Sequence, residues 1–223
     1  MKHRESFGVI FDMDGVLIDS AAPHLQSWRL LAAELGTQVS EQQCAALFGR
    51  QNRDIIPALF GETTPERIQA LADRKELLYR DLVRRDPPIV EGAVDLIRAL
   101  HETGARLAIG SSAPRANIDL VLSAMDVSDL MHAVVSGDEV SRGKPDPQVF
   151  QMACERLALT PGRCVVVEDA PVGITAAKAA GTHAVAVLMH HSRESFVHSN
   201  LIVDELRQLT PEMLAALVQR PAS

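Results

Sequence analysis

Two aspartates, Asp12 and Asp14, follow a short apolar run near the start of the chain. Side chains at positions i and i+2 of an extended strand point the same way, and Gly15 permits a sharp turn directly after them. One carboxylate at such a turn can attack phosphorus while the other donates and accepts protons. A plain surface turn or part of a calcium loop is the alternative, but an EF-hand needs further acids where residues 16–18 are apolar.

A second pair of acids, Glu168 and Asp169, ends the apolar run that begins at Cys164. Magnesium in proteins takes one or two carboxylates together with water and substrate phosphate oxygens. A helix N-cap at Asp169 is the alternative, but capping needs one acid and not two. We therefore expect a metal site at this pair.

Residues suited to bind a phosphate group lie in two further segments. Ser111 and Ser112 follow an apolar run, where a hydroxyl and backbone N–H groups can hold phosphate oxygens; a helix N-cap explains them equally well. Lys144 offers a point charge for a phosphate oxygen, and an exposed loop lysine is the alternative. The segment is not a nucleotide phosphate loop, because Pro145 stands where that loop has Ser or Thr.

The elements that must position these residues follow an α/β pattern. Apolar runs that fit buried parallel strands recur at residues 7–12, 106–111, 132–136, 164–169, 183–188 and, in a shorter form, 201–204. Apolar residues at helical spacing lie between them. This alternation predicts a parallel sheet with helices on both faces. All four sites fall at the carboxyl ends of predicted strands or in the loops beyond them, at the edge where ligands bind such sheets, and together they suit phosphoryl transfer.

Residues 17–87 break the alternation, because they hold helical patterns and no convincing strand. The run from Arg84 to Pro88 then ends the segment with a stiff linker. We expect a core of residues 1–16 and 88–223 and an inserted helical cap of residues 17–87, with hinges at their junctions.

The composition bounds the class of protein. The chain has 223 residues, of which 47% are hydrophobic and 23% charged, as in ordinary globular proteins. A formal net charge of -7 disfavours nucleic acid as a partner. The three cysteines form no Cys-x-x-Cys pair, so we expect neither a disulfide framework nor a thiolate zinc site.

The sequence shows no signal for a membrane or for export. No apolar stretch approaches the roughly 20 residues that span a bilayer, and residues 1–6 lead into too short an apolar run for a signal peptide. We expect a cytoplasmic monomer or weak homodimer. Its expected partner is a small phosphorylated metabolite, and not a nucleic acid or a membrane.

The four segments, taken in their order along the chain, resemble the haloacid dehalogenase superfamily, and the resemblance extends from Phe7 to about Leu188. They resemble in particular its branch of β-phosphoglucomutases and sugar-phosphate or phosphoglycolate phosphatases. The resemblance implies a Rossmann-like core with a helical cap inserted after the first motif, and Mg²⁺ as cofactor. It implies Asp12 as the nucleophile and Asp14 as the general acid/base. The presence of Asp14 argues against the dehalogenases themselves, which lack that second acid.

The resemblance also implies the phosphate and metal ligands. Ser111, with Ser112 beside it, binds phosphate, and Lys144 binds phosphate and steadies the nucleophile. Mg²⁺ would be held by Asp12, the backbone carbonyl of Asp14 and Asp169, with Glu168 in or next to the shell.

The cap is expected to choose the substrate. His24 fits the pattern of the mutases, although similar phosphatases also have it, and Arg50 and Arg53 are candidate substrate cations. Each of the three has an ordinary surface role as its alternative. Trp28 is expected to be cap core and not a substrate platform.

Phosphatase and mutase differ in the cations they need, because a mutase must hold a sugar with phosphates at both ends. The candidate cap cations are Arg50, Arg53, Arg74 and Lys75. The register implied by the resemblance places Asn52 at the mutase's phosphate-binding arginine and Asp81 at a cap lysine. We therefore expect a phosphatase, with a sugar phosphate mutase as the alternative. A non-catalytic binding protein on this fold would be expected to have lost one of the key acids or the lysine, and all are present.

Overall fold

The computed structural model describes residues 6–47 and 50–219. The expectation about export rests on residues 1–6, and most of these lie outside the described residues. The chain divides into two compact units, one from residues 1–18 and 89–223 and the other from residues 19–88. Among the described residues, every strand of the sheet belongs to the first unit, and the second is helical.

The first unit is built on a sheet of six parallel strands in the order β3-β2-β1-β4-β5-β6. The strands are β1 (Gly8–Phe11), β2 (Arg106–Gly110), β3 (Ala133–Val135), β4 (Cys164–Glu168), β5 (His183–Val187) and β6 (Leu201–Val203). This confirms the predicted α/β fold. The strand order runs outward from β1 in one direction to β3 and then restarts at β4 on its other side. In open α/β sheets, ligands bind at such a reversal.

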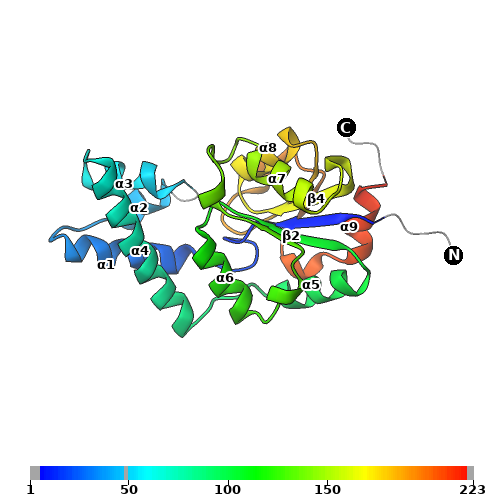
Figure 1. Cartoon of the computed structure of the whole chain (residues 1–223), viewed down its shortest axis with the longest axis horizontal. Helices are drawn as coiled ribbons and strands as arrows, with labels where there is room; N and C mark the ends of the chain where they lie inside the picture. Colours follow the sequence, from blue (N-terminus) through cyan, green and yellow to red (C-terminus); the bar gives the residue numbers. More distant parts are fainter. Residues whose placement is uncertain (1–5, 48–49, 220–223) are drawn as a thin grey trace. The chain divides into compact units, whose positions relative to one another are not determined.

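Helices cover both faces of this sheet, as Figure 1 shows. Helices α7 (Gln148–Arg156) and α8 (Pro171–Ala179) lie on one face, and α5 (Ala93–Glu102), α6 (Arg115–Ala124) and α9 (Pro211–Leu217) lie on the other. Short 3₁₀ helices are η1 (Ser128–Leu130), η2 (Gly137–Glu139), η3 (Pro161–Arg163), η4 (Arg193–Phe196) and η5 (Leu206–Gln208).

The central strands are apolar throughout because both of their faces are covered. Val9, Ile10 and Phe11 of β1 are fully buried, and so is every residue of β4. Ile10 and Phe150 belong to a large hydrophobic cluster that β1, β4, α7 and α8 share. Burial on both faces explains why these strands are continuous apolar runs without polar alternation.

The second unit contains α1 (Ala21–Glu34), α2 (Glu41–Ala45), α3 (Asn52–Phe60) and α4 (Pro65–Arg85). Thr64 begins α4 as an N-cap, because its side chain accepts a 3.3 Å hydrogen bond from the N–H of Arg67. The unit has its own hydrophobic cluster, which includes Trp28 and Ile56. Trp28 is 4% exposed, which confirms it as core.

The segments that lead out of and back into the first unit are hydrogen-bonded to each other. Ile18 and Ile89 form an antiparallel bridge, and the N–H of Val90 donates to the carbonyl of Leu17 at 3.0 Å. The N–H of Asp19 donates to the carbonyl of Pro88 at 2.8 Å.

Cys44, Cys154 and Cys164 are free thiols and are buried. Within residues 6–47 and 50–219, the helices are too short or too polar to cross a membrane.

Candidate active site

The end of β1 brings together the first two pairs of acids. Phe11 lies opposite Val167 of β4 and Ile109 of β2, so the residues after it lie between the ends of both neighbouring strands. The N–H of Asp12 continues the ladder by donating to the carbonyl of Val167 at 2.9 Å. Asp12 is therefore placed at the reversal of strand order, with Glu168 on the adjacent strand end.

Three carboxylates gather at this point. One oxygen each from Asp12, Glu168 and Asp169 lies within 4.8 Å of the others, and these residues are only 8%, 1% and 4% exposed. The Oδ1 atom of Asp12 is buried, and no described residue donates a well-aligned hydrogen bond to it. Clustered carboxylate oxygens are the ligands that hard divalent cations such as Mg²⁺ take. The donor set therefore fits a divalent metal.

Burial without enough compensating charge changes the acidity of this cluster. Burial raises the pKa of Asp12 to about 7, although the Lys144 ammonium acts in the opposite direction. Burial, followed by the Glu168 carboxylate, raises the pKa of Asp169 to about 9. Two acids that resist ionisation side by side mark a place where a bound cation would replace protons.

Lys144 supplies the cation of the cluster. Its side chain is 5% exposed, and its Nζ lies 2.7 Å from Glu168 Oε1 and 3.1 Å from Asp12 Oδ1. The alternative of an exposed loop lysine is therefore wrong. Burial by itself would lower the pKa of Lys144, but the Asp12 and Glu168 carboxylates outweigh it and raise that pKa above its usual range.

Glu168 uses both of its oxygens. Oε1 accepts the hydrogen bond from Lys144, and Oε2 accepts the backbone N–H groups of Asp169 and Ala170 at 2.9 and 2.8 Å, at the entry to α8. Helix N-termini stabilise negative charge. Glu168 thus holds Lys144 toward Asp12, and its expected place among the metal ligands stays a prediction.

Asp169 is not the helix cap that its alternative required, because Ala170 is the N-cap of α8. Its carboxylate lies directly over the turn after β1. A Cβ atom on Gly15 would lie 1.9 Å from Asp169 Oδ2, and Gly15 has a φ of +77°. Only glycine accepts both the conformation and this close approach.

A second glycine, which sequence reasoning missed, makes room for Glu168. A Cβ atom on Gly173, in the first turn of α8, would lie 1.7 Å from Glu168 Oε1. The signal that would have identified it is a glycine inside a helix, five positions after a buried acid at a strand end.

Asp14 and the two serines lie on the loops that follow β1 and β2. Asp14 is half-buried, and its backbone pairs with Ile18 in the turn after β1. Ser111 is 1% exposed, and its Oγ accepts the N–H of Ala113 at 3.2 Å. Because α6 begins at Arg115 with Pro114 as its N-cap, the alternative that Ser111 or Ser112 caps this helix is wrong.

The helical unit holds a buried polar cluster of its own. Lys75 Nζ lies 2.7 Å from His24 Nδ1 and 2.9 Å from Glu76 Oε1, and Glu76 also accepts a 2.7 Å hydrogen bond from Asn52. The His24 ring stacks on Tyr79 with their centroids 4.2 Å apart. Lys75 and Glu76 are 1% and 6% exposed.

The other cap residues singled out in the sequence lie outside this cluster. Arg50 and Arg53 are exposed, so neither is part of this buried cluster. The register implied by the resemblance places Asp81 where a mutase has a cap lysine. Asp81 is exposed and forms an ion pair of 3.0 Å with Arg84. The lysine that does lie beside His24 is Lys75.

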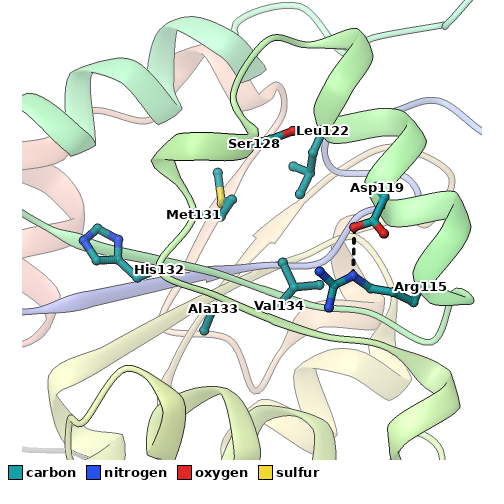
Figure 2. Close-up of a pocket in the computed structure, with 8 residues that line it drawn as sticks. All are labelled: Arg115, Asp119, Leu122, Ser128, Met131, His132, Ala133 and Val134. Carbon is teal, nitrogen blue, oxygen red and sulfur yellow. Dashed lines mark hydrogen bonds and ion pairs between the residues drawn. The ribbon is translucent and has the colours of Figure 1, made fainter.

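A separate pocket of about 400 Å³ lies along α6 and the start of β3. Figure 2 shows its lining, in which Arg115 turns toward Asp119 and forms an ion pair of 2.8 Å. His132 Nδ1 accepts the N–H of Leu107 at 3.1 Å. The lining includes none of the clustered acids and not Lys144. We therefore take the strand-end cluster, and not this pocket, as the candidate active site.

We predict that Gly173→Ala destabilises the chain, although alanine normally favours a helix over glycine. The added methyl group must displace Glu168, and overpacking of this kind costs about 1–3 kcal/mol in the free energy of unfolding. Chemical denaturation measures the effect. Gly162→Ala is the matched control, because nothing lies within 4 Å of a Cβ atom there. Equal effects of the two substitutions would contradict the contact.

We further predict that metal binding and pH are linked. The folded chain keeps protons on Asp12 and Asp169 that the unfolded chain releases above pH about 4. Without metal, the free energy of unfolding should therefore fall as the pH rises through the pKa of Asp12, about 7, and that of Asp169, about 9. A cation must displace these protons, so its stabilisation should grow with pH.

Thermal unfolding with MgCl₂ or with EDTA across this pH range measures the linkage. Asp169→Asn should remove most of the increase in Tm that MgCl₂ causes. A metal-induced increase that is the same at acidic and at mildly alkaline pH would count against this site.

Comparisons with known proteins identify the family of the chain. The family model of haloacid dehalogenase-like hydrolases matches residues 9–187. The chain is similar to fructose-1-phosphate phosphatase YqaB of Escherichia coli (strain K12), with 34% identity over 185 residues that cover 81% of this chain and 95% of the relative. It is also similar to β-phosphoglucomutase of Bacillus subtilis (strain 168), with 30% identity over 214 residues and 92% of each chain covered.

Among solved structures, the fold matches a HAD hydrolase of family IA, variant 3, from Entamoeba histolytica HM-1:IMSS. The TM-score is 0.86 at 26% identity, and the match covers 96% of this chain and all of the other, 100%. The family model covers well over half of the sequence, from β1 to the end of β5. The chain therefore belongs to the haloacid dehalogenase-like hydrolase family and is an enzyme, as the resemblance implied.

Proposed function

We propose that this enzyme is a Mg²⁺-dependent phosphatase that hydrolyses a small phosphomonoester through an aspartyl-phosphate on Asp12. The observation that carries the proposal is the buried cluster of Asp12, Glu168 and Asp169, in which Asp12 lies beside the ammonium of Lys144. The named relatives act on phosphorylated sugars, which supports a sugar phosphate or a similar metabolite as substrate.

The residues of the cluster fit a divalent metal. Asp12 and Asp169 would hold it together with the backbone carbonyl of Asp14, while Glu168 remains bound to Lys144. A bound Mg²⁺ supplies positive charge that offsets the charge of the phosphoryl oxygens.

In the first half-reaction, an oxygen of Asp12 attacks phosphorus. A bond from this oxygen to phosphorus forms, and the bond from phosphorus to the ester oxygen breaks. Asp14 gives its proton to the leaving alkoxide, which departs as an alcohol. The Lys144 ammonium, 3.1 Å from Asp12 Oδ1, favours the ionised carboxylate that this attack needs.

In the second half-reaction, water attacks the phosphorus of the aspartyl-phosphate. Asp14, now a carboxylate, takes a proton from this water, and the bond to Asp12 breaks to release inorganic phosphate. Ser111 and Ser112, with nearby backbone N–H groups, are proposed to hold the phosphoryl oxygens in both steps. Lys144 balances the charge that builds up on these oxygens.

His24, Arg50 and Arg53 remain proposed substrate contacts of the helical unit. The buried cluster makes His24 the best supported of the three, because Lys75 and Tyr79 fix its ring. Replacement of His24 by Asn should raise KM for the preferred substrate more than Arg53→Ala does.

A phosphomutase is the second candidate function, because a β-phosphoglucomutase covers 92% of this chain at 30% identity. In a mutase, a sugar hydroxyl takes the place of water in the second half-reaction. Conversion of β-glucose 1-phosphate to glucose 6-phosphate with a bisphosphate activator would identify the mutase. Release of inorganic phosphate from a panel of sugar phosphates and small phosphorylated acids would identify the phosphatase.

We predict that Asp12→Asn lowers kcat by at least about 10³-fold, because an amide is a poor nucleophile. Release of phosphate from the best substrate of the panel measures the loss, and phosphate carried on the wild-type chain should be absent from the variant. Asp204→Asn, an exposed acid paired with Arg193, is the matched control. Turnover that survives Asp12→Asn would exclude Asp12 as the nucleophile.

We predict that Asp14→Asn slows both half-reactions, each by about 10²–10⁴-fold, since one group serves as acid and then as base. Rapid-quench measurement of phosphoenzyme formation and decay separates the two steps. An unchanged rate of decay would restrict Asp14 to the role of acid.

A further inference from the structure

The Lys144 ammonium has an aromatic neighbour that the reaction scheme does not use. Nζ of Lys144 lies over the ring of Phe150, 4.9 Å from the ring centroid. Phe150 is fully buried, and the Lys144 side chain is 5% exposed. A cation over an aromatic face is attracted by the negative face of the ring, and more strongly where water is excluded.

The ring completes the surroundings of the ammonium. Glu168 Oε1 at 2.7 Å and Asp12 Oδ1 at 3.1 Å are its charged neighbours, and the Phe150 face is its third close contact. A lysine side chain is a flexible stem of four carbons, and it needs such contacts to keep one conformation.

The backbone around Phe150 is built to fit the ring. Phe150 lies in the first turn of α7, where its N–H donates to the carbonyl of Pro147 at 3.1 Å. A Cβ atom on Gly110 would lie 3.0 Å from Cδ1 and 3.1 Å from Cε1 of the ring. Gly110 is the last residue of β2 and directly precedes Ser111, so the ring packs against the strand end that leads into the candidate phosphate loop.

We propose that Phe150 is a positioning residue that holds the Lys144 ammonium in place while the charge on Asp12 changes. The proposal rests on the function proposed above for Asp12 and Lys144. When Asp12 carries the phosphoryl group, its carboxylate charge is lost, and the attraction between Asp12 and Lys144 weakens. The attraction to the ring does not change in this step, so it keeps Nζ directed at the phosphoryl oxygens.

The test replaces Phe150 with phenylalanines that carry one, two or three ring fluorines. Fluorine withdraws electron density from the ring face with little change in size. The affinity for inorganic phosphate in the presence of Mg²⁺ should fall with each fluorine. The full series should span roughly 2- to 30-fold, the range expected for a cation–π contact.

Two controls separate the charge effect from packing. The same fluorine series at Phe196 is the matched control, since Phe196 lies in the same hydrophobic cluster and its ring neighbour is the His191 imidazole, edge-on at 6.1 Å. In a Lys144→Met background, fluorination of Phe150 should leave phosphate affinity unchanged. A series that is flat at Phe150 while the wild type binds phosphate, or equally steep in the Lys144→Met background, overturns the proposal.

A second readout does not depend on phosphate. In protein labelled with ¹⁵N-lysine, the ammonium protons of Lys144 should resonate upfield because of the ring above them, and Phe150→Leu should remove this shift. If wild-type protein fails to bind phosphate, the proposed function fails, and the ammonium signal still decides whether the ring holds Lys144. A signal that Phe150→Leu does not move overturns the contact.

Discussion

Three buried carboxylates share one buried ammonium at the end of the central strand, and their charges do not cancel. A buried ion without a partner costs several kcal/mol, so each acid needs compensation. Glu168 receives it from Lys144 and two backbone N–H groups. For Asp12 and Asp169 the compensation is incomplete, and their raised pKa values follow from that deficit. The same deficit is what makes the site suited to a cation and a phosphoryl group.

The backbone around the cluster is shaped by the need to bring these groups close together. Glycines at positions 15 and 173 leave space where a methyl group would overlap a carboxylate. The reversal of strand order at β1 sets the ends of β1 and β4 side by side without a crossing loop between them. Glu168 is the last residue of β4, and Asp12 and Asp169 directly follow β1 and β4, whereas loops after β2 and β3 carry the serines and the lysine.

The sequence predicted the strands well because strands buried on both faces are continuous apolar runs. It also predicted which acids stand at strand ends, because that depends only on local order along the chain. Its alternatives for Lys144 and Ser111 were wrong, since burial and helix starts depend on packing. The contact of Lys75 with His24 was missed because the two residues lie 51 positions apart, and that of Lys144 with Glu168 because they lie 24 apart. The contacts of Gly173 and Phe150 were missed because they depend on how the elements pack.

The paired segments around Ile18 and Ile89 have an evolutionary consequence. Because the chain leaves and returns through neighbouring backbone, the sheet unit closes on itself whatever lies between these two points. Helical units of different sequence or length can be exchanged there without a change in strand order. If the helical unit chooses the substrate, as proposed, such exchange would let a lineage acquire new substrates by swapping one module, while the chemistry at the strand ends stays under separate selection.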